Sequence, residues 1–322
     1  MFLMGNVINS IHRINKEDPL NIILLCNNHE KYLSLVCKTG HNFYLWKKDG
    51  SPSSWNEGIE KKPENLRVLD RRALCTNFDY IISNDRLEQY NEASELALKF
   101  HTPIILIDHC CSSILKPHDV FSDVAPSDPQ ALLKTPGAVV SLSADISKSW
   151  HKNGLDLVIP IGIDTEKFSA KTPDGPDDVF GELSETTIVF DNNVGQSVGQ
   201  RIFARLVNKS YSVIPTDSDV SNKEEIYQHG SYFINPYKNI TTKLLEAMSS
   251  ENVPICFRGA EMESFIEHGA NGFLVDSEYE IAAILEELDI DASTRIAVGK
   301  NARDKVLALN SMDTFLSKWM HL

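Results

Sequence analysis

Short apolar runs alternate with amphipathic stretches along the chain, and their lengths separate strands from helices. The runs do not alternate apolar with polar residues, which is typical of strands buried on both faces of a parallel sheet. Stretches 32–37 and 85–100 between them have helical spacing of apolar residues. The predicted strands of this half are 21–26, 41–46, 66–69, 78–83, 103–108, 138–143 and 155–160. The pattern predicts a doubly wound α/β unit.

A stretch rich in Pro, Gly and Asp at 169–178 interrupts the alternation, as expected of a linker, and the alternation then restarts. The further predicted strands are 186–191, 211–215, 231–235, 253–257 and 272–275, and the helices are 196–208, 240–250, 278–288, 292–308 and 312–321. We predict two Rossmann-like domains, 1–163 and 164–308, and a helix at about 309–322 is a candidate to pack back on the first. Ligands bind at the carboxyl ends of parallel strands, so the site is expected in a cleft between the domains.

Composition and charge narrow the class of protein. Of 322 residues, 42% are hydrophobic, which is enough for a sizeable core. The net charge of -14 argues against a surface that coats nucleic acid or anionic membrane, but it permits a local basic cleft. No apolar run approaches the roughly 20 residues of a membrane span, and the first residues lack a signal-peptide pattern. The cysteines lack CxxC spacing, so we predict free thiols and a cytoplasmic protein, in the host cytoplasm if viral.

Two stretches carry recognisable motifs. VIPIGIDTEKF at 158–168 is an apolar strand followed by Pro, Gly, Asp and Phe. INPYKNITTKLLEAMSSENVPICFRGAEMESFIEHGANGFLV at 234–275 contains a strand, a helix ending in Glu-Ala-Met, a second strand, a loop with Glu, and a final strand. Both resemble the retaining nucleotide-sugar glycosyltransferases of the GT-B fold, the glycosyl transferases group 1 type. Residues 27–168 are also similar to transferases of phage and marine viral genomes.

The resemblance implies a GT-B fold and a sugar donor held mostly by the second domain. Glu246 would accept hydrogen bonds from the ribose hydroxyls. Asn239 would cap the helix at 240–250, and Thr241 and Thr242 would face the phosphates, because a helix N-terminus attracts anions. Ordinary capping and a solvated glutamate are the alternatives. The implied donor is a UDP-sugar, with no further cofactor and no metal.

The resemblance implies that an Arg/Lys pair holds the diphosphate, and the chain has no clean match to that pair. Lys238 stands where the family has the first of two paired glutamates, and it would pair with the diphosphate or an acidic sugar instead. Arg201, Arg205 and Arg258 are further candidates, with surface solvation as the alternative. Glu263 matches the glutamate of the family's Pro-Glu segment, unless it only begins a helix.

In the first domain, polar residues follow the predicted strands. His109 comes directly after 103–108, where the family often has an active-site histidine, and His29 follows the first strand. We take both as candidate catalytic residues, against the alternative of a structural His109 beside Asp108. The loop before Glu30 lacks the family's glycines, which weakens backbone contact with phosphate. The candidate substrate-binding residues of this domain are Asn28, Glu30, Asn84 and Arg86.

Asp217-Ser218-Asp219 is the stronger of two DxD strings that could suggest a metal, the other being Asp289-Ile290-Asp291. Such DxD strings bind Mn²⁺ or Mg²⁺ in a different transferase fold. Turn and capping roles explain it here, because it lies between a predicted strand and a helical pattern. We therefore predict no metal site.

The acceptor stays open between two classes, a glycan or glycolipid precursor and a hydroxymethylated pyrimidine in phage DNA. Segment 46–72 contains seven basic residues that would favour DNA, and Trp46 and Trp55 would be available for stacking on bases. A solvated loop is the alternative. The basic residues are Lys47, Lys48, Lys61, Lys62, Arg67, Arg71 and Arg72. A different class of function is a catalytically inactive GT-B protein that only binds nucleotide sugars, for which Lys238 and the glycine-poor first loop argue.

Overall fold

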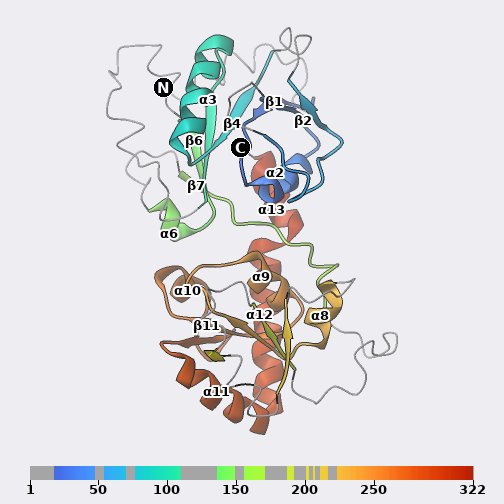
Figure 1. Cartoon of the computed structure of the whole chain (residues 1–322), viewed down its shortest axis with the longest axis vertical. Helices are drawn as coiled ribbons and strands as arrows, with labels where there is room; N and C mark the ends of the chain where they lie inside the picture. The colour runs from blue at the N-terminus through green and yellow to red at the C-terminus, as the bar shows by residue number, and fades with distance from the viewer. Residues whose placement is uncertain are drawn as a thin grey trace. The chain divides into compact units, whose positions relative to one another are not determined.

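The computed structural model describes residues 18–47, 54–69, 77–109, 136–148, 156–170, 187–191, 201–202, 206, 211–216 and 223–321. The chain forms two compact units, Met1–Pro160 with Leu316–Leu322, and Ile161–Phe315 (Figure 1). The predicted domain boundary at 163 is three residues beyond Pro160, where the first unit ends.

The described strands of the first unit form a parallel sheet in the order β3-β2-β1-β4-β5-β6-β7. The strands are β1 (Asn21–Leu24), β2 (Asn42–Leu45), β3 (Leu66–Val68), β4 (Tyr80–Asn84), β5 (Ile104–Asp108), β6 (Pro136–Ser141) and β7 (Asp156–Val158). The chain moves outward from β1 in one direction and then returns to place β4 on its other side. The carboxyl ends of β1 and β4 are therefore a topological switch point, where open sheets bind ligands.

Helices cover both faces of this sheet. Alternate strand residues such as Ile23 and Leu106 pack against α3 (Leu87–Phe100). The opposite face lies against α2 (Glu30–Cys37) and the end of α13 (Met312–Met320). A short helix, α6 (Ala144–Ser147), follows β6. Because both faces of the central strands β1 and β5 are buried, these strands are mostly apolar, which is the pattern that the sequence shows.

The described strands of the second unit form a parallel sheet in the order β12-β11-β10-β8-β9. The strands are β8 (Thr187–Phe190), β9 (Ser212–Pro215), β10 (Tyr232–Asn235), β11 (Val253–Phe257) and β12 (Phe273–Val275). The helices are α8 (Lys223–His229), α9 (Thr242–Ser249), α10 (Ala260–Phe265), α11 (Glu278–Ile290) and α12 (Ala292–Asn310). The direction of winding reverses between β8 and β10, so the loops after these two strands form the switch point of this unit.

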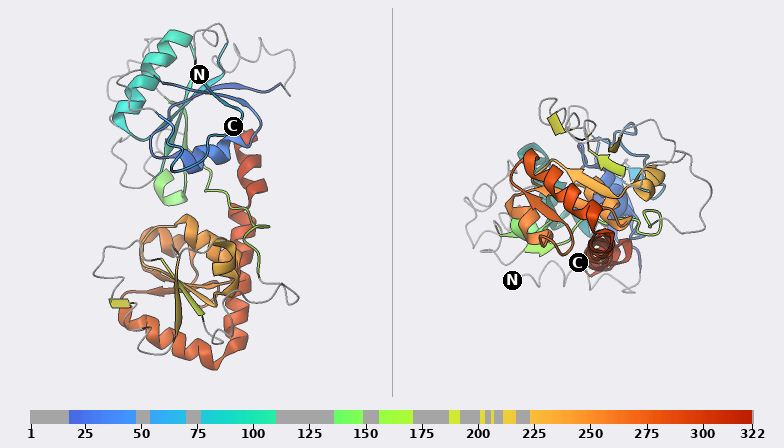
Figure 2. Two further views of the ribbon diagram at one scale, coloured as in Figure 1. Left: turned by 45° about the vertical axis from the view of Figure 1, so that its right-hand side comes forward. Right: turned by 90° about the horizontal axis from the view of Figure 1, so that it is seen from below.

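Two core clusters cover the faces of the second sheet. Apolar residues of α8, α9 and α10 pack on one face, and those of α11 on the other. The long helix α12 contributes to both clusters and runs beside the sheet in Figure 2. The predicted α/β class and the parallel sheets are thus confirmed.

Two local predictions are corrected. Asn239 does not cap the helix at 240–250: α9 begins at Thr242, and Thr241 is its N-cap, in extended backbone and with its Oγ1 accepting from the Leu244 N–H at 3.1 Å. The helix predicted from residue 32 begins at Glu30. Glu30 is therefore the first residue of a helix and is buried, rather than part of an open loop.

Candidate functional site

Three polar side chains of the first unit meet at its switch point. The rings of His29 and His109 stack with centroids 3.8 Å apart and planes 6° from parallel. His109 Nε2 lies 2.9 Å from Asn84 Oδ1, and Asn84 Nδ2 donates to the Leu25 carbonyl at 3.0 Å. Because β1, β4 and β5 are adjacent and parallel, the residues at their carboxyl ends lie at one edge. The structure thus brings together the two predicted catalytic histidines.

Local backbone places His29 over the sheet edge. Asn28 has a φ of 62°, in the left-handed region that asparagine tolerates better than most residues. This turn lies between β1 and α2 and leaves His29 at the position before α2. His109 is held at its backbone N–H by Asp85 Oδ2 at 3.4 Å.

Burial keeps both rings uncharged. It lowers the pKa of His29 to about 4, with a further contribution from Arg86 and an opposing one from Glu30. Burial and the neighbouring His29 hold the pKa of His109 well below its ordinary value. Burial also raises the pKa of the Asp85 carboxyl. The pair therefore consists of two neutral imidazoles at neutral pH, suited to hydrogen bonding rather than to acting as cations.

The other predicted substrate residues of this unit are differently placed. Asn28 and Arg86 are exposed at the same edge. Asn84 is fully buried, and its amide holds Leu25 and His109. Glu30 is 1% exposed, and its Oε1 accepts a hydrogen bond from the Asn56 N–H at 3.1 Å. Glu30 therefore anchors the loop at 54–60, and its role as a substrate ligand stays a prediction.

In the second unit, the predicted ribose ligand is oriented by a tyrosine. Tyr227 of α8 donates from its hydroxyl to Glu246 Oε2 at 3.1 Å. Tyr227 is buried, and burial together with Glu246 raises the pKa of its hydroxyl, which therefore stays protonated and donates. The Phe168 ring meets the Tyr227 ring edge-on, with the ring centroids 5.8 Å apart. A half-buried carboxylate thus lies on α9 in a fixed orientation.

A lysine that the sequence did not single out lies in the first turn of α9. Lys243 Nζ is 2.8 Å from Asp191 Oδ1 and 2.8 Å from Thr216 Oγ1. Asp191 follows β8 and Thr216 follows β9, so the lysine ties α9 to two strand ends. A cation is unfavourable near a helix N-terminus, and Asp191 offsets that cost. The only sequence signals were an aspartate after an apolar run and a lysine beside two threonines.

The remaining predicted donor residues lie at the same edge or near α11. Lys238 and Asn239 are exposed in the loop after β10, and Thr242 is exposed at the start of α9. A Cβ at Gly259 would lie 2.9 Å from the Lys238 carbonyl oxygen, so the glycine allows the loops after β10 and β11 to approach closely.

The predicted basic residues that are described are paired with carboxylates. Arg258 Nη1 lies 3.3 Å from Glu263 Oε1, and its Nε lies 3.2 Å from Asp276 Oδ1. Arg201 Nε lies 3.1 Å from Glu278 Oε1. The structure therefore brings the predicted residues Arg258 and Glu263 together in one exposed pair. Arg205 lies outside the described residues.

The tryptophans of the predicted basic strip have other partners. Trp46 packs against the core cluster under α3. The indole Nε1 of Trp55 donates to the Glu60 carbonyl at 2.8 Å. Lys47, Lys61 and Arg67 are exposed and Lys62 is half-buried, while Lys48, Arg71 and Arg72 lie outside the described residues. The two indoles therefore take part in local packing, which weakens the interpretation of this segment as a base-stacking surface.

The described residues show neither a metal-ligand cluster nor a membrane-spanning helix. Among the described residues, no group of three His, Cys, Asp or Glu side chains is arranged to hold a metal ion. Asp217 and Asp219 lie outside those residues, so the prediction of no metal site stays a prediction. No described helix combines the length and apolar character needed to cross a bilayer.

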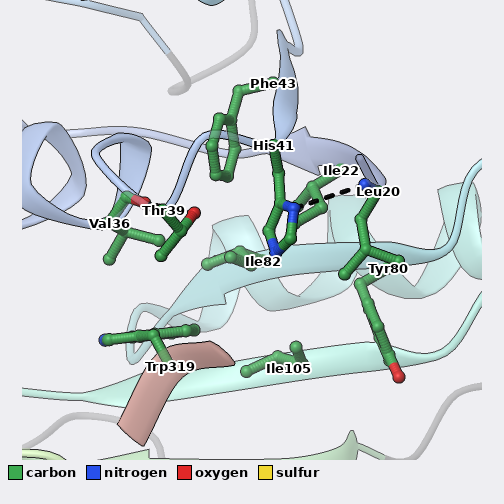
Figure 3. Close-up of a pocket in the computed structure, with 10 residues that line it drawn as sticks. All are labelled: Leu20, Ile22, Val36, Thr39, His41, Phe43, Tyr80, Ile82, Ile105 and Trp319. Atoms are coloured by element: carbon green, nitrogen blue, oxygen red, sulfur yellow. Dashed lines mark hydrogen bonds between the residues drawn. The ribbon is translucent and has the colours of Figure 1, made fainter. Parts of the chain in front are cut away.

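A hollow of the first unit lies apart from the histidine pair. Its lining is mostly apolar, and Trp319 of α13 closes one side (Figure 3). His41, its most polar member, accepts from the Leu20 N–H at 3.3 Å (Figure 3). The hollow is therefore a feature of packing between sheet, α2 and α13.

Comparisons with known proteins agree with this geometry. Residues 194–289 match the family model described as "Glycosyl transferases group 1". The sequence gives no significant match to a curated protein. Among solved structures, a glycosyltransferase from Rickettsia africae aligns with a TM-score of 0.64 at 12% identity, covering 94% of this chain and 97% of that chain.

Other solved structures align over nearly the whole chain. Anabaena Alr3699/HepE in complex with UDP and glucose gives a TM-score of 0.64 at 13% identity, over 93% of this chain and 98% of that one. Sucrose-phosphate synthase from Thermosynechococcus elongatus gives 0.61 at 11% identity, over 93% and 97%. The fold is GT-B, two Rossmann-like domains in one chain, as predicted. Together, the fold and the matched segment support a GT-B glycosyltransferase.

Proposed function

We propose that this protein transfers a sugar from a nucleoside-diphosphate sugar to an acceptor hydroxyl with retention of configuration. The observation that carries the proposal is the edge of the second sheet at α9. Here a threonine-capped helix N-terminus, Lys243 and the oriented Glu246 carboxylate lie within one segment that matches the glycosyl transferases group 1 family.

This edge has the groups that the chemistry needs. Transfer breaks the bond between the anomeric carbon and the diphosphate oxygen, and negative charge grows on that oxygen. Three kinds of group at this edge are suited to stabilise that negative charge. They are the first amides of α9, the Thr242 hydroxyl and the Lys243 ammonium. The acceptor oxygen bonds to the same face of the carbon, and the leaving phosphate takes its proton. No resident metal or other cofactor enters the proposal.

The donor class follows from Glu246. A carboxylate accepts hydrogen bonds from two adjacent hydroxyls, which suits the ribose of a UDP-sugar. Anabaena Alr3699/HepE, which has a similar fold, was solved in complex with UDP and with UDP-glucose, and these structures support the choice of a UDP-sugar. In the proposal, His29 and His109 of the first unit border the reacting carbon as neutral hydrogen-bonding groups.

Glu246→Ala tests the donor site directly. Loss of charge-assisted hydrogen bonds to ribose costs about 1.5–3 kcal/mol, so calorimetric titration with UDP should show a roughly 10- to 150-fold weaker affinity. Tyr227→Phe removes only the orienting hydroxyl and should weaken affinity by about fivefold, for about 1 kcal/mol. Glu287→Ala, an exposed glutamate of α11, is the control. Wild-type affinity in Glu246→Ala would overturn the assignment.

We propose that the acceptor belongs to one of the two classes that the sequence suggests. These are a glycan or glycolipid precursor and a hydroxymethylated pyrimidine in DNA. A screen of UDP-sugars with lipid-linked glycans, free glycans and hydroxymethylated DNA separates them by the product formed. Donor binding without turnover on any acceptor would instead favour the inactive binder that Lys238 suggests. We also propose that the protein acts in the cytoplasm, as the sequence predicts.

A further inference from the structure

The orientation of one buried amide determines which nitrogen of His109 carries a proton. Asn84 is fully buried, and its Nδ2 lies 3.0 Å from the Leu25 carbonyl oxygen. A carbonyl only accepts hydrogen bonds, so the amide cannot be turned around without placing two oxygens against each other. The Asn84 Oδ1 atom is therefore fixed toward His109 Nε2, 2.9 Å away.

An amide oxygen accepts and never donates, so the ring nitrogen opposite it must carry the hydrogen. A neutral imidazole has one such hydrogen, and the other nitrogen keeps its lone pair. We propose that Asn84 is a positioning residue that holds His109 as the neutral Nε2–H tautomer, so that Nδ1 accepts a hydrogen bond from a sugar hydroxyl. The tautomer follows from the contacts alone, and the sugar as its partner rests on the proposed function.

The groups around the ring agree with a neutral state. His29 stacks on one face, and Tyr32 of α2 meets the ring edge-on at 5.3 Å. The Tyr32 hydroxyl donates to the Ile159 carbonyl. Asp85 accepts from the backbone N–H of His109, and Asp108 precedes it in the chain. The hydrogen bonds of His109 involve its backbone N–H and its Nε2, and among the described residues none donates to Nδ1.

An amide at position 84 is the informative choice of residue. A carboxylate opposite a histidine N–H stabilises the imidazolium, whereas a neutral amide leaves the charged form without that compensation. Burial and the stacked His29 also lower the pKa of His109. Protonation of Nδ1 would remove the acceptor, so the arrangement keeps a lone pair available at neutral pH.

Nitrogen NMR of the intact protein labelled at its histidines tests the tautomer. His109→Gln assigns the His109 signals by their disappearance. At pH 7 the expected result is a pyrrole-like Nε2 and a pyridine-like Nδ1. A pyridine-like Nε2, or a doubly protonated ring at that pH, would overturn the proposal.

Asn84→Asp provides the second test, with Ser83→Ala as the matched control from the same buried strand. The carboxylate should raise the pH at which His109 becomes charged by at least one unit, while Ser83→Ala leaves it unchanged. If Asn84→Asp does not fold, the wild-type spectrum still decides the tautomer. An unshifted titration in a folded Asn84→Asp protein would contradict the positioning role.

Activity then tests the partner separately. If the sugar hydroxyl binds Nδ1, kcat/KM of Asn84→Asp should be about tenfold lower one pH unit below the new titration point of His109 and should recover above that point. If kcat/KM does not recover although the NMR titration shifts, the proposed sugar contact is wrong and the assignment of the tautomer is unaffected. If no sugar transfer is found with any donor, the proposed function fails, and the NMR result remains valid by itself.

Discussion

At the scale of single residues, the candidate site depends on pairs that fix orientation. Asn84 orients His109, and Tyr227 orients Glu246. Both orienting residues are buried, so they hold their partners without themselves being open to a ligand. Each pair joins a buried hydrogen-bonding group to a half-buried one, an arrangement that preorganises a site at the cost of burying polar atoms.

The stacked histidines predict an acid-sensitive first unit. Because their pKa values are lowered in the folded state, the unfolded chain takes up protons below pH 6.5 that the folded chain does not yet bind. His29 of the folded chain takes up its proton only at about pH 4, and His109 only well below pH 6.5. Their contribution to the free energy of unfolding is constant above 6.5 and falls as the pH decreases toward 4. Urea unfolding at pH 7.5 and pH 5 should show this loss.

Variants assign the loss to this pair. His29→Gln and His109→Gln should each be less sensitive to acid than the wild type, because one buried titrating ring is removed. His321→Gln, at an exposed histidine, should behave as the wild type. Equal acid sensitivity in all four proteins would show that other groups are responsible.

At the scale of elements, the N-terminus of α9 is held by a charged pair rather than by packing alone. Lys243 is 26% exposed at its side chain, and Asp191 is 4% exposed. Together with Thr216, they connect the ends of β8 and β9 to the first turn of α9. The same lysine lies in the first turn of α9, beside the helix amides of the proposed donor site.

Lys243→Met should therefore affect stability and binding separately. It leaves Asp191 buried and unpaired, which should lower the free energy of unfolding by about 2–3 kcal/mol, less than for a fully buried pair. The double variant Lys243→Met with Asp191→Asn removes the stranded charge and should regain part of that loss. Thermal unfolding measures both.

UDP titration of the same proteins separates the two roles of the lysine. The double variant should still bind UDP more weakly than the wild type, because the cation is absent. Thr241→Ala, which removes only the N-cap, is the comparison for helix stability and should cost about 1 kcal/mol. Wild-type UDP affinity in the double variant would exclude Lys243 from the donor site.

At the scale of the whole molecule, the last residues of the chain belong to the first unit. Leu316–Leu322 are grouped with Met1–Pro160, although the preceding helices belong to the second unit. Trp319 is 6% exposed, packs near Tyr32 with ring centroids 6.4 Å apart, and closes the hollow between the sheet and α2. Integrity of the first unit thus depends on residues at the far end of the sequence.

Trp319→Ala should destabilise the first unit by about 3–5 kcal/mol, because it removes a large buried side chain and leaves a cavity. Hydrogen exchange should rise in peptides of β1, β4 and α2, with little change in β10 and β11. Met320→Ala, at a side chain that is 65% exposed, is the control. Increased exchange confined to the second unit would contradict this assignment.

Much of the fold was predictable, because apolar runs report burial on both faces of a sheet. Strand positions agreed to within a few residues, and the α/β class followed from the alternation. The order of strands did not follow, since it depends on which side each crossover returns to. Capping was misassigned to Asn239, because Thr241 and Asn239 are both good capping residues and only the backbone conformation distinguishes them.

The sequence by itself determined the class of fold, the motif at 234–275 and the presence of polar residues after the strands. Only the tertiary structure decided which of these residues act together. Lys243 and Asp191 are 52 positions apart, and Asn84 and His109 are 25 apart. Parallel strands bring such residues to one edge only after the chain has crossed the sheet, and no local pattern records which strands become neighbours.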